Sequence, residues 1–405
     1  MDFSKLISSD IQSYIKQNLN SDLNKLLLKK SPFPDVSIQE IVQQIKGKKT
    51  AEKKFPFLLK EGIIFPPNLN LEQASSQSTA EYKAQNLKGK SFLDLTCGFG
   101  IDAYFLSQNF DEITLIEQNP ELISIVENNW KILNRKANFI NQNLEEFLDG
   151  LSFDKLRINS AQTDNQSQIK NKFDVVYLDP ARRDQQNKKK FLLEDLSPNL
   201  LEIEEELNSI SDKIIVKLSP LIDISYLISE LKNITEIQII AVRNEVKELL
   251  LIIENQESGA KNQDTKITCI NLESEEPEFS FNFSDEKSAE SEFSKSLNFL
   301  YIPNNSILKA GAFNIISEKF GLKKLHPNTH FYTSEHKIEN FPGRVLEIEK
   351  VEAKDLKKGE KYNIVSKNYP LKPEEIKKKY KLTDGGNHYL IFTQSVKGKE
   401  ILRSL

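Results

Sequence analysis

Cysteine and long apolar runs are scarce in this sequence. The 405 residues include only two cysteines, Cys97 and Cys269, which argues against a disulfide framework or a cysteine-based zinc site and favours a reducing cytoplasm. No apolar run approaches the roughly 20 residues that a membrane-spanning helix needs. The first residues show no basic segment followed by an apolar stretch, so we expect no secretory signal peptide and no membrane contact.

Charge is plentiful, and its distribution along the chain is uneven. The net charge is −4. Residues 1–70 carry 11 Lys and Arg against 7 Asp and Glu, and residues 301–405 carry 20 against 12, whereas the middle of the chain is acidic. Basic ends suit a polyanion such as nucleic acid, although solvated lysine-rich helix faces explain the same pattern. The length predicts two to four domains.

Hydrophobic periodicity separates two large regions. Residues 1–70 place apolar side chains at helical spacing, which predicts an N-terminal helical region. Residues 71–258 alternate short apolar runs with helical patterns, which predicts an α/β domain with a mostly parallel, doubly wound sheet. Seven strands are expected there, over residues 92–95, 113–117, 139–140, 173–178, 214–218, 237–242 and 249–253.

The remaining chain is predicted as small α+β units. Residues 259–298 are polar and are expected to form a hairpin or linker. A new unit is expected over residues 299–341, with one helix at 307–319. Residues 342–405 are predicted as a last unit of strands and one helix.

A turn with two glycines directly follows the first predicted strand and precedes a helix. Its residues are Asp94-Leu95-Thr96-Cys97-Gly98-Phe99-Gly100. A Gly-x-Gly turn at a helix N-terminus lets the backbone approach a ligand closely. The third glycine of the dinucleotide fingerprint is replaced by Ala103, and an acidic residue begins the turn. We therefore expect a ligand with an amino-acid end and no pyrophosphate, its ammonium group on Asp94. The expected contacts are Asp94, Thr96, Cys97, Gly98 and Gly100.

Polar residues also end the next two predicted strands. Glu117 ends the second predicted strand, 17 residues after Gly100, and Gln118 follows it. A carboxylate at this place can accept both hydroxyls of a ribose. Asn143 follows the third strand, where a polar side chain can reach an adenine amino group. Each of these residues alone is more often a helix cap or a solvated charge. In this order and spacing, however, they form one consistent set of ligand contacts.

This pattern resembles the class I methyltransferase superfamily, with the turn at 94–100 as motif I, Glu117 as the ribose carboxylate and residues 179–182 as motif IV. A closer similarity is to a bacterial methyltransferase family with a ferredoxin-like segment and a C-terminal THUMP-like domain. The residues that carry it are Glu72-Gln73-Ala74-Ser75-Ser76, Thr79-Ala80, Tyr177-Leu178-Asp179-Pro180-Ala181-Arg182-Arg183, Lys309-Ala310-Gly311-Ala312, Phe341-Pro342-Gly343-Arg344 and Asp384-Gly385-Gly386. The resemblance implies a Rossmann-like fold, S-adenosylmethionine as cofactor and RNA, either tRNA or rRNA, as substrate. It also implies a ferredoxin-like segment at 299–341 and a THUMP-like domain at 342–405.

The segment before the first strand, residues 72–80, carries side chains that can donate to a ligand carboxylate. In class I enzymes a segment here covers the methionine end of the cofactor, which makes Gln73, Ser76 and Thr79 candidate cofactor contacts. A capped helix start, with Ser76 or Ser78 followed by Glu81, explains the same residues. The two interpretations are compatible, and both stay open.

Motif IV, Asp179-Pro180-Ala181-Arg182, ends the fourth predicted strand, beside the point where the strand order reverses and ligands bind. Methyl transfer is a displacement in which the enzyme positions the nucleophile and, where needed, takes a proton. Asp179, Pro180 and Arg182 are therefore the candidate catalytic residues. Asp179 also borders the cofactor, and Arg182 can stack on a base or clamp a phosphate. Enzymes that methylate exocyclic amines usually have a second proline and an aromatic residue here, so Ala181 and Arg182 argue against that target.

Other chemistries find less support in the sequence. Transfer to pyrimidine C5 needs a nucleophilic cysteine in motif IV, which has none. No carboxylate or cysteine is spaced to complete a metal site with His326 and His330. The sequence therefore predicts an RNA methyltransferase that transfers the methyl group to a base positioned by motif IV, without a metal or an obligate protein partner. A small-molecule or protein methyltransferase, and an RNA-interaction protein that binds S-adenosylmethionine without catalysis, stay open.

Overall fold

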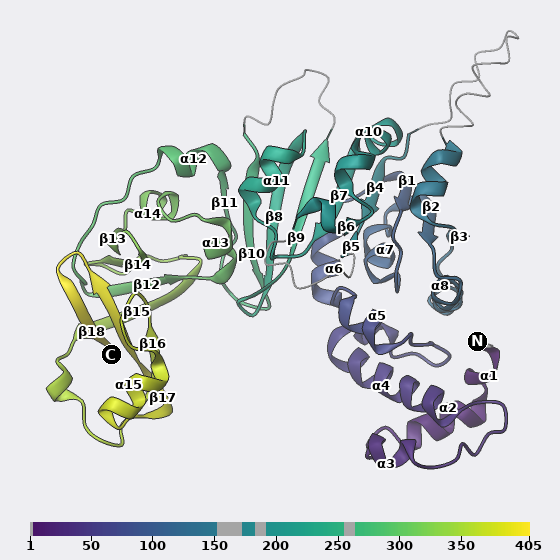
Figure 1. Ribbon diagram of the computed structural model, residues 1–405, viewed down its shortest axis with the longest axis horizontal. Coiled ribbons are helices and arrows are strands. Elements are labelled where there is room, and N and C mark those ends of the chain that lie inside the picture. The colour runs from purple at the N-terminus through teal and green to yellow at the C-terminus, as the bar shows by residue number, and fades with distance from the viewer. Residues whose placement is uncertain (1–2, 152–171, 183–191, 255–263) are drawn as a thin grey trace, which may run out of the picture. The chain divides into compact units, whose positions relative to one another are not determined.

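The computed structural model describes residues 3–151, 172–182, 192–254 and 264–405 (Figure 1). The chain divides into two compact units. Unit 1 consists of Met1–Asp223, Ser229–Asn233 and Leu251–Gly259, and unit 2 of Ile224–Ile228, Ile234–Leu250 and Ala260–Leu405.

Unit 1 begins with helices. They are α1 (Phe3–Leu6), α2 (Ser9–Gln17), α3 (Leu23–Leu27), α4 (Ile38–Lys54) and the 3-10 turn η1 (Pro56–Leu58). A capping box starts α4, because Ser37 Oγ accepts from Glu40 N while Glu40 Oε2 accepts from Ser37 N. No helix in the described part of the chain is long and apolar enough to cross a membrane.

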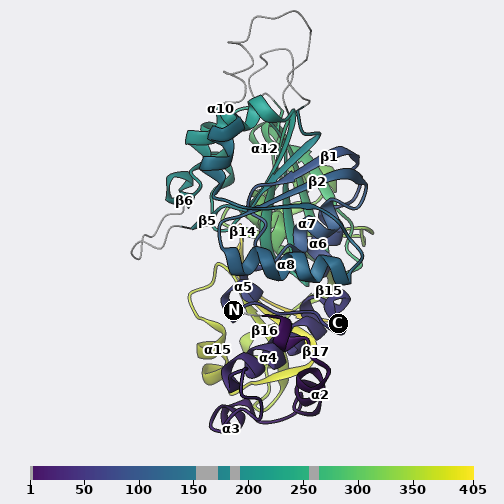
Figure 2. The same ribbon diagram turned by 90° about the vertical axis from the view of Figure 1, so that its right-hand side faces the viewer.

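The N-terminal helices share one hydrophobic core with α7 (Ile101–Leu106) and α8 (Pro120–Ile132). Figures 1 and 2 show the helical region next to α8. The ring of Phe57 stacks on that of Tyr104, with centroids 4.9 Å apart. The Asn129 side chain accepts a hydrogen bond from Ile64 N and donates one to Ile64 O, at 2.9 and 2.8 Å. Aromatic and amide contacts of this kind hold the helical region against the helices that flank the sheet of unit 1.

The sheet of unit 1 is parallel and has the strand order β7-β4-β1-β2-β3. The strands are β1 (Gly89–Asp94), β2 (Phe110–Glu117), β3 (Asn138–Asn141), β4 (Val175–Leu178) and β7 (Lys213–Leu218). The chain starts at β1, moves outward to β3, and then returns to the other side of β1 with β4. The order therefore reverses between β1 and β4, and the carboxyl ends of these strands meet at the edge where ligands bind in such sheets.

Helices and short segments connect these strands. Two short helices precede β1, α5 (Asn68–Gln73) and α6 (Gln77–Lys83). After β4, the two-residue strand β5 (Ala181–Arg182) pairs antiparallel with β6 (Leu196–Ser197). The turn η2 (Leu193–Asp195) precedes β6, and α10 (Leu200–Ile210) follows it with Asn199 as its N-cap. The helix α11 (Ile224–Glu230) comes after β7.

Unit 2 begins with strands in the order β11-β10-β8-β9. They are β8 (Ile234–Val242), β9 (Glu245–Glu254), β10 (Lys266–Leu272) and β11 (Phe279–Asn282). All seven predicted strands are therefore present, and the predicted α/β fold class is confirmed. The segment expected to be a hairpin or linker adds two more strands, because β10 pairs in parallel with β8 over seven residues and β11 pairs with β10.

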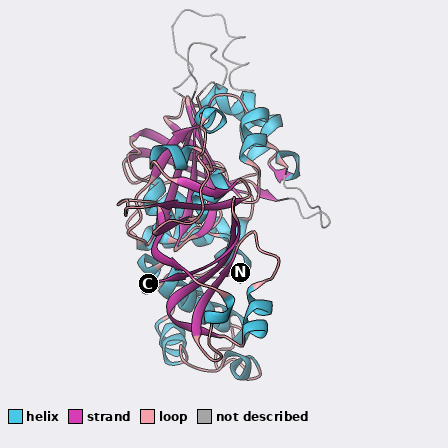
Figure 3. Cartoon of the chain, turned by 90° about the vertical axis from the view of Figure 1, so that its left-hand side faces the viewer, coloured by secondary structure: helices cyan, strands magenta, loops and turns pink. Residues whose placement is uncertain are grey.

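A second sheet, seen in Figure 3, makes up the end of unit 2, with the order β13-β14-β12-β15-β18-β17-β16. Its strands are β12 (Phe299–Pro303), β13 (Lys323–His326), β14 (Thr329–Ser334), β15 (Gly343–Lys350), β16 (Lys361–Ser366), β17 (Thr383–Ser395) and β18 (Gly398–Ser404). The helices of this unit are α12 (Phe283–Ser288), α13 (Asn305–Ala310), α14 (Ile315–Lys319) and α15 (Pro373–Tyr380). The single helix predicted over 307–319 is wrong. Gly311 takes a left-handed conformation with φ of 72° and ends α13 before α14 begins.

Candidate active site

The turn from β1 to α7, residues 94–100, is called the glycine turn below. Gly98 and Gly100 both have left-handed backbones, with φ of 56° and 73°. A Cβ on Gly100 would lie 2.8 Å from Cγ1 of Val126, whereas a Cβ on Gly98 would meet nothing closer than 3.8 Å. Gly98 is therefore required for its conformation, and Gly100 for its conformation and for space.

Asp94 begins the glycine turn and is buried, with 1% of its surface exposed. Its Oδ1 accepts a hydrogen bond from Thr96 N at 2.9 Å. Burial raises the pKa of Asp94 well above its usual range, and the carboxylates of Asp102, Asp179 and Glu117 act in the same direction. A buried carboxyl group with a raised pKa gives up its proton when a cation binds beside it. The position of Asp94 therefore suits an ammonium group.

Glu117 ends β2, next to the glycine turn, because β1 and β2 run in parallel. Its Oε2 accepts from Gly98 N at 2.9 Å and its Oε1 from Asn119 N at 2.8 Å. These two backbone donors fix the carboxylate beside the turn. Gln118 is exposed, and its carbonyl oxygen accepts a hydrogen bond from Asn141 Nδ2.

Two further predicted contacts have structural roles of their own. Asn143 Oδ1 accepts from Glu146 N at 2.7 Å and so caps the helical residues 144–151. Cys97 is buried in the glycine turn, where its backbone N donates to Ile116 O at 2.8 Å. Burial raises the pKa of the Cys97 thiol well above its usual range, so this thiol is unreactive.

The segment at residues 72–80 contains a capped helix start. Ser76 is the N-cap of α6, and its Oγ accepts from Thr79 N at 3.3 Å. Thr79 is buried and donates its hydroxyl to Ser76 O at 3.1 Å. Gln73 is exposed at the end of α5. The structure therefore contains the capping interaction at Ser76.

Motif IV follows β4 and is joined to the glycine turn. Asp179 N donates to Thr96 Oγ1 at 2.6 Å, and Asp179 Oδ2 lies 2.6 Å from Lys217 Nζ. The dense surroundings of the carboxyl group raise the pKa of Asp179, and the charge of Lys217 opposes this rise. Pro180 is buried. The side chain of Arg182 and residues 183–191 lie outside the described residues.

Comparisons with known proteins agree with this geometry. Family models match at residues 77–207 (Conserved hypothetical protein 95), 299–342 (ferredoxin-like domain) and 343–403 (THUMP domain-like). A solved protein of Porphyromonas gingivalis W83, described as a proposed methyltransferase, is 28% identical, with a TM-score of 0.83 over 100% of this chain and 98% of that chain. This chain is an S-adenosylmethionine-dependent methyltransferase with the class I fold.

The predicted family, with its catalytic, ferredoxin-like and THUMP-like parts in that order, is confirmed, and the cofactor of this class of enzyme is S-adenosylmethionine. Two further solved structures overlap less. A proposed class I S-adenosylmethionine-dependent methyltransferase of Listeria monocytogenes is 14% identical over 65% of this chain and 94% of that chain, with a TM-score of 0.33. TrmK of M. capricolum with S-adenosylhomocysteine is 15% identical over 44% and 68%, with a TM-score of 0.30. No curated protein matches the chain.

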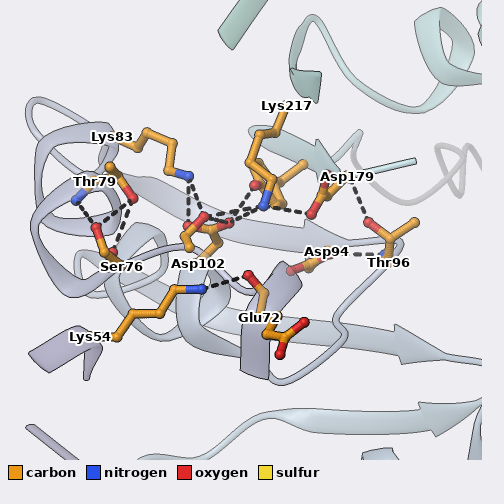
Figure 4. Close-up of polar contacts among 12 residues, drawn as sticks. Lys54, Glu72, Ser76, Thr79, Lys83, Asp94, Thr96, Asp102, Asp179 and Lys217 are labelled. Atoms are coloured by element: carbon orange, nitrogen blue, oxygen red, sulfur yellow. Dashed lines mark hydrogen bonds and ion pairs between the residues drawn. The ribbon is translucent and has the colours of Figure 1, made fainter. Parts of the chain in front are cut away.

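Next to the glycine turn, this methyltransferase contains a largely buried set of charged side chains that pair with one another (Figure 4). We call it the lysine network: Lys83, Asp102, Lys217 and Asp179, together with the hydroxyls of Ser75 and Tyr177. Lys83 Nζ lies 2.8 Å from Asp102 Oδ1, and Lys217 Nζ lies 3.4 Å from Asp102 Oδ2. Both hydroxyls donate to Asp102 Oδ2 at 2.7 Å. Positive and negative groups thus alternate from Lys83 to Asp179.

Asp102 is the centre of the lysine network. Burial raises its pKa, but the charges of Lys83 and Lys217 outweigh burial and hold the pKa of Asp102 well below its usual range. Asp102 therefore stays ionised at neutral pH. One signal was present in the sequence: Asp102 lies between Ile101 and Ala103, in a first helical turn that is otherwise apolar and buried.

The remaining candidates lie elsewhere in the methyltransferase. Within the described ranges, no group of three or more His, Cys, Asp or Glu is arranged to hold a metal ion. In unit 2, His330 stacks on Phe313 with ring centroids 3.7 Å apart.

Proposed function

We propose that this S-adenosylmethionine-dependent methyltransferase acts on RNA, either tRNA or rRNA, in the cytoplasm. The observation that carries the proposal is the match of residues 343–403 to a THUMP domain-like model, in a region of high positive charge. Lys354, Lys357 and Lys378 are examples of the exposed lysines of this region. Lysines of this kind bind phosphate groups without regard to sequence and weaken their hold as salt rises.

The cofactor is proposed to lie along the glycine turn. Asp94 would accept the ammonium group, Gly98 and Gly100 would allow close approach of the backbone, and Glu117 would accept the ribose hydroxyls. The buried carboxyl group of Asp94 supports this fit, because burial and the nearby carboxylates raise its pKa and an ammonium group bound beside it would offset both effects. Thr96, Cys97, Gln118 and Asn143 border the same site, and Gln73, Ser76 and Thr79 lie in the segment proposed to cover its methionine end.

The proposed reaction is a displacement at the methyl carbon that the cofactor supplies. Asp179, at the carboxyl end of β4, would accept a hydrogen bond from the nucleophile and take its proton. The hydrogen bond from Asp179 N to Thr96 Oγ1 fixes this residue relative to the glycine turn. Arg182 is proposed to contact the RNA. A folded RNA would present an unpaired nucleotide to the site.

The test is transfer of labelled methyl groups from S-adenosylmethionine to total RNA from cells that lack the gene. RNA is separated by size, and a protein fraction and a small-molecule fraction are assayed in parallel. We expect label in one size class of RNA, no label with Asp179→Ala, and normal label with Asp111→Ala, a change at an exposed position on β2. Label confined to protein or small molecules, or no label despite cofactor binding, would refute RNA methylation.

A further inference from the structure

We propose that the methyl acceptor is a hydroxyl oxygen, the ribose 2′-hydroxyl of RNA, and that Lys217 stabilises this oxygen as Asp179 removes its proton. The inference rests on the proposed RNA methyltransferase function. The acceptor's O–H bond breaks, and its proton goes to the Asp179 carboxylate. The oxygen forms a bond to the methyl carbon of S-adenosylmethionine, whose carbon–sulfur bond breaks and leaves its electron pair on sulfur.

Lys217 is in the right place for this role. It ends β7, the strand beside β4, and its Nζ lies 2.6 Å from Asp179 Oδ2. The Lys217 side chain is 9% exposed, whereas that of Asp179 is 36% exposed. Asp179 can therefore meet a substrate from solvent while Lys217 supports it from the interior. Any group that hydrogen-bonds to the Asp179 carboxylate lies within a few ångströms of the Lys217 charge.

The lysine network surrounds the Lys217 ammonium group with carboxylates. Asp179 lies on one side of its ammonium group and Asp102 on the other, and Lys83 balances the second carboxylate. Ser75 Oγ also accepts from Lys217 Nζ at 3.2 Å. These ion pairs fix the Lys217 ammonium group beside the Asp179 carboxylate.

A fixed cation at this point discriminates between acceptor atoms. A neutral nitrogen becomes positive as it takes a methyl group, so a nearby ammonium ion raises the barrier to its methylation. A hydroxyl oxygen becomes negative as it loses its proton, so the same ammonium ion lowers the barrier. The sequence of motif IV agrees, because Ala181 replaces the second proline and residue 182 is Arg rather than an aromatic that stacks on a base.

The first experiment identifies the product made by the unaltered protein. RNA labelled with radioactive S-adenosylmethionine is digested to nucleosides and, in a second portion, hydrolysed with alkali. We expect the label in 2′-O-methylnucleosides and in alkali-resistant dinucleotides. Label in a methylated base would overturn the hydroxyl assignment and leave RNA methylation intact, whereas absence of label from all RNA would overturn the proposed function itself. The result does not depend on the folding of any variant.

The second experiment separates the role of Lys217 from a merely structural one. Lys217→Met is compared with Lys213→Met, which removes a lysine from the other end of β7, where it pairs with Glu254. We expect kcat to fall about 10²- to 10³-fold in Lys217→Met, the size expected for loss of a charge that stabilises a transition state. Without the ammonium group the pKa of Asp179 rises further, so the acidic limb of the kcat/KM profile moves to higher pH.

Lys213→Met is expected to behave as the unaltered enzyme in kcat and in the position of that acidic limb. Lys217→Arg, which keeps a cation, should recover part of the lost kcat. Equal kcat in Lys217→Met and the unaltered enzyme, with cofactor bound normally by both, would overturn the role of Lys217.

Discussion

In the glycine turn, the carboxylates of Asp94 and Glu117 accept hydrogen bonds from backbone N–H groups a few residues away or on the next strand. In the lysine network, by contrast, Asp102 contacts side chains from α6, β4, β7 and the residues before α6. The backbone itself thus supplies the hydrogen-bond donors for these two carboxylates. The network exists only when distant segments have all come together, and each of its charges depends on the others.

The largest expected effect is at the centre of the network. Asp102→Ala removes the buried carboxylate that pairs with both Lys83 and Lys217. Breaking a buried ion pair in this way costs about 3–5 kcal/mol. We expect the free energy of unfolding in urea to fall by this amount. Asp111→Ala, at an exposed position on β2, should change it by no more than about 0.5 kcal/mol. Equal stability of the two variants would show that the ion pairs of Asp102 with Lys83 and Lys217 do not stabilise the fold.

Substitutions at the glycines of the glycine turn should lower the stability of the fold for steric reasons. Gly100→Ala forces a left-handed conformation on alanine and places its Cβ 2.8 Å from Val126 Cγ1, so we expect a loss of about 2–3 kcal/mol. Gly98→Ala is the matched control, because it has the same backbone penalty of about 1–2 kcal/mol and no close contact. Thermal unfolding of both variants measures the difference. A Gly98→Ala variant as unstable as Gly100→Ala would contradict the contact with Val126.

Lowering the pH should weaken the lysine network. The pKa of Asp102 is lowered in the folded protein, so its contribution to stability is complete above its unfolded pKa of about 3.9 and is lost as pH falls toward the folded value. One group of this kind changes the free energy of unfolding by at most about 1.4 kcal/mol per pH unit. Urea unfolding between pH 5 and pH 3 should therefore show a shallower decline in Asp102→Asn than in the unaltered protein. Parallel curves would mean that Asp102 is not held ionised by its lysines.

The smallest expected effect on stability is at Asp94. Its pKa is raised, so its charged form opposes folding as pH rises above the unfolded value, and Asp94→Asn should not lower the free energy of unfolding at pH 7. Cofactor affinity should nevertheless fall about 10- to 100-fold, because a charge-assisted hydrogen bond is lost. Calorimetric titration with S-adenosylhomocysteine measures the loss. A variant that is less stable but binds normally would assign Asp94 to the fold rather than to the ligand.

The same contrast explains what could be predicted from the sequence. The turn at Asp94, Gly98 and Gly100 could be recognised because its residues are consecutive and its conformation requires glycine. Lys83 and Asp102 could not be paired in advance, since nothing in one sequence says that α6 and α7 bring these side chains together. The break at Gly311 was missed because the apolar spacing continues through it, and only the left-handed backbone ends the helix.

The ladder between β10 and β8 bears on how the protein can be divided. Its seven residue pairs include Ile237 with Ile267 and Ile239 with Cys269, and all four of these side chains are buried. A fragment cut at residue 258 would keep β8 but lose β10. The cut would expose an apolar edge strand with open backbone donors and acceptors, a template for aggregation. The shortest fragment that avoids this hazard must extend past Asn282, the end of β11.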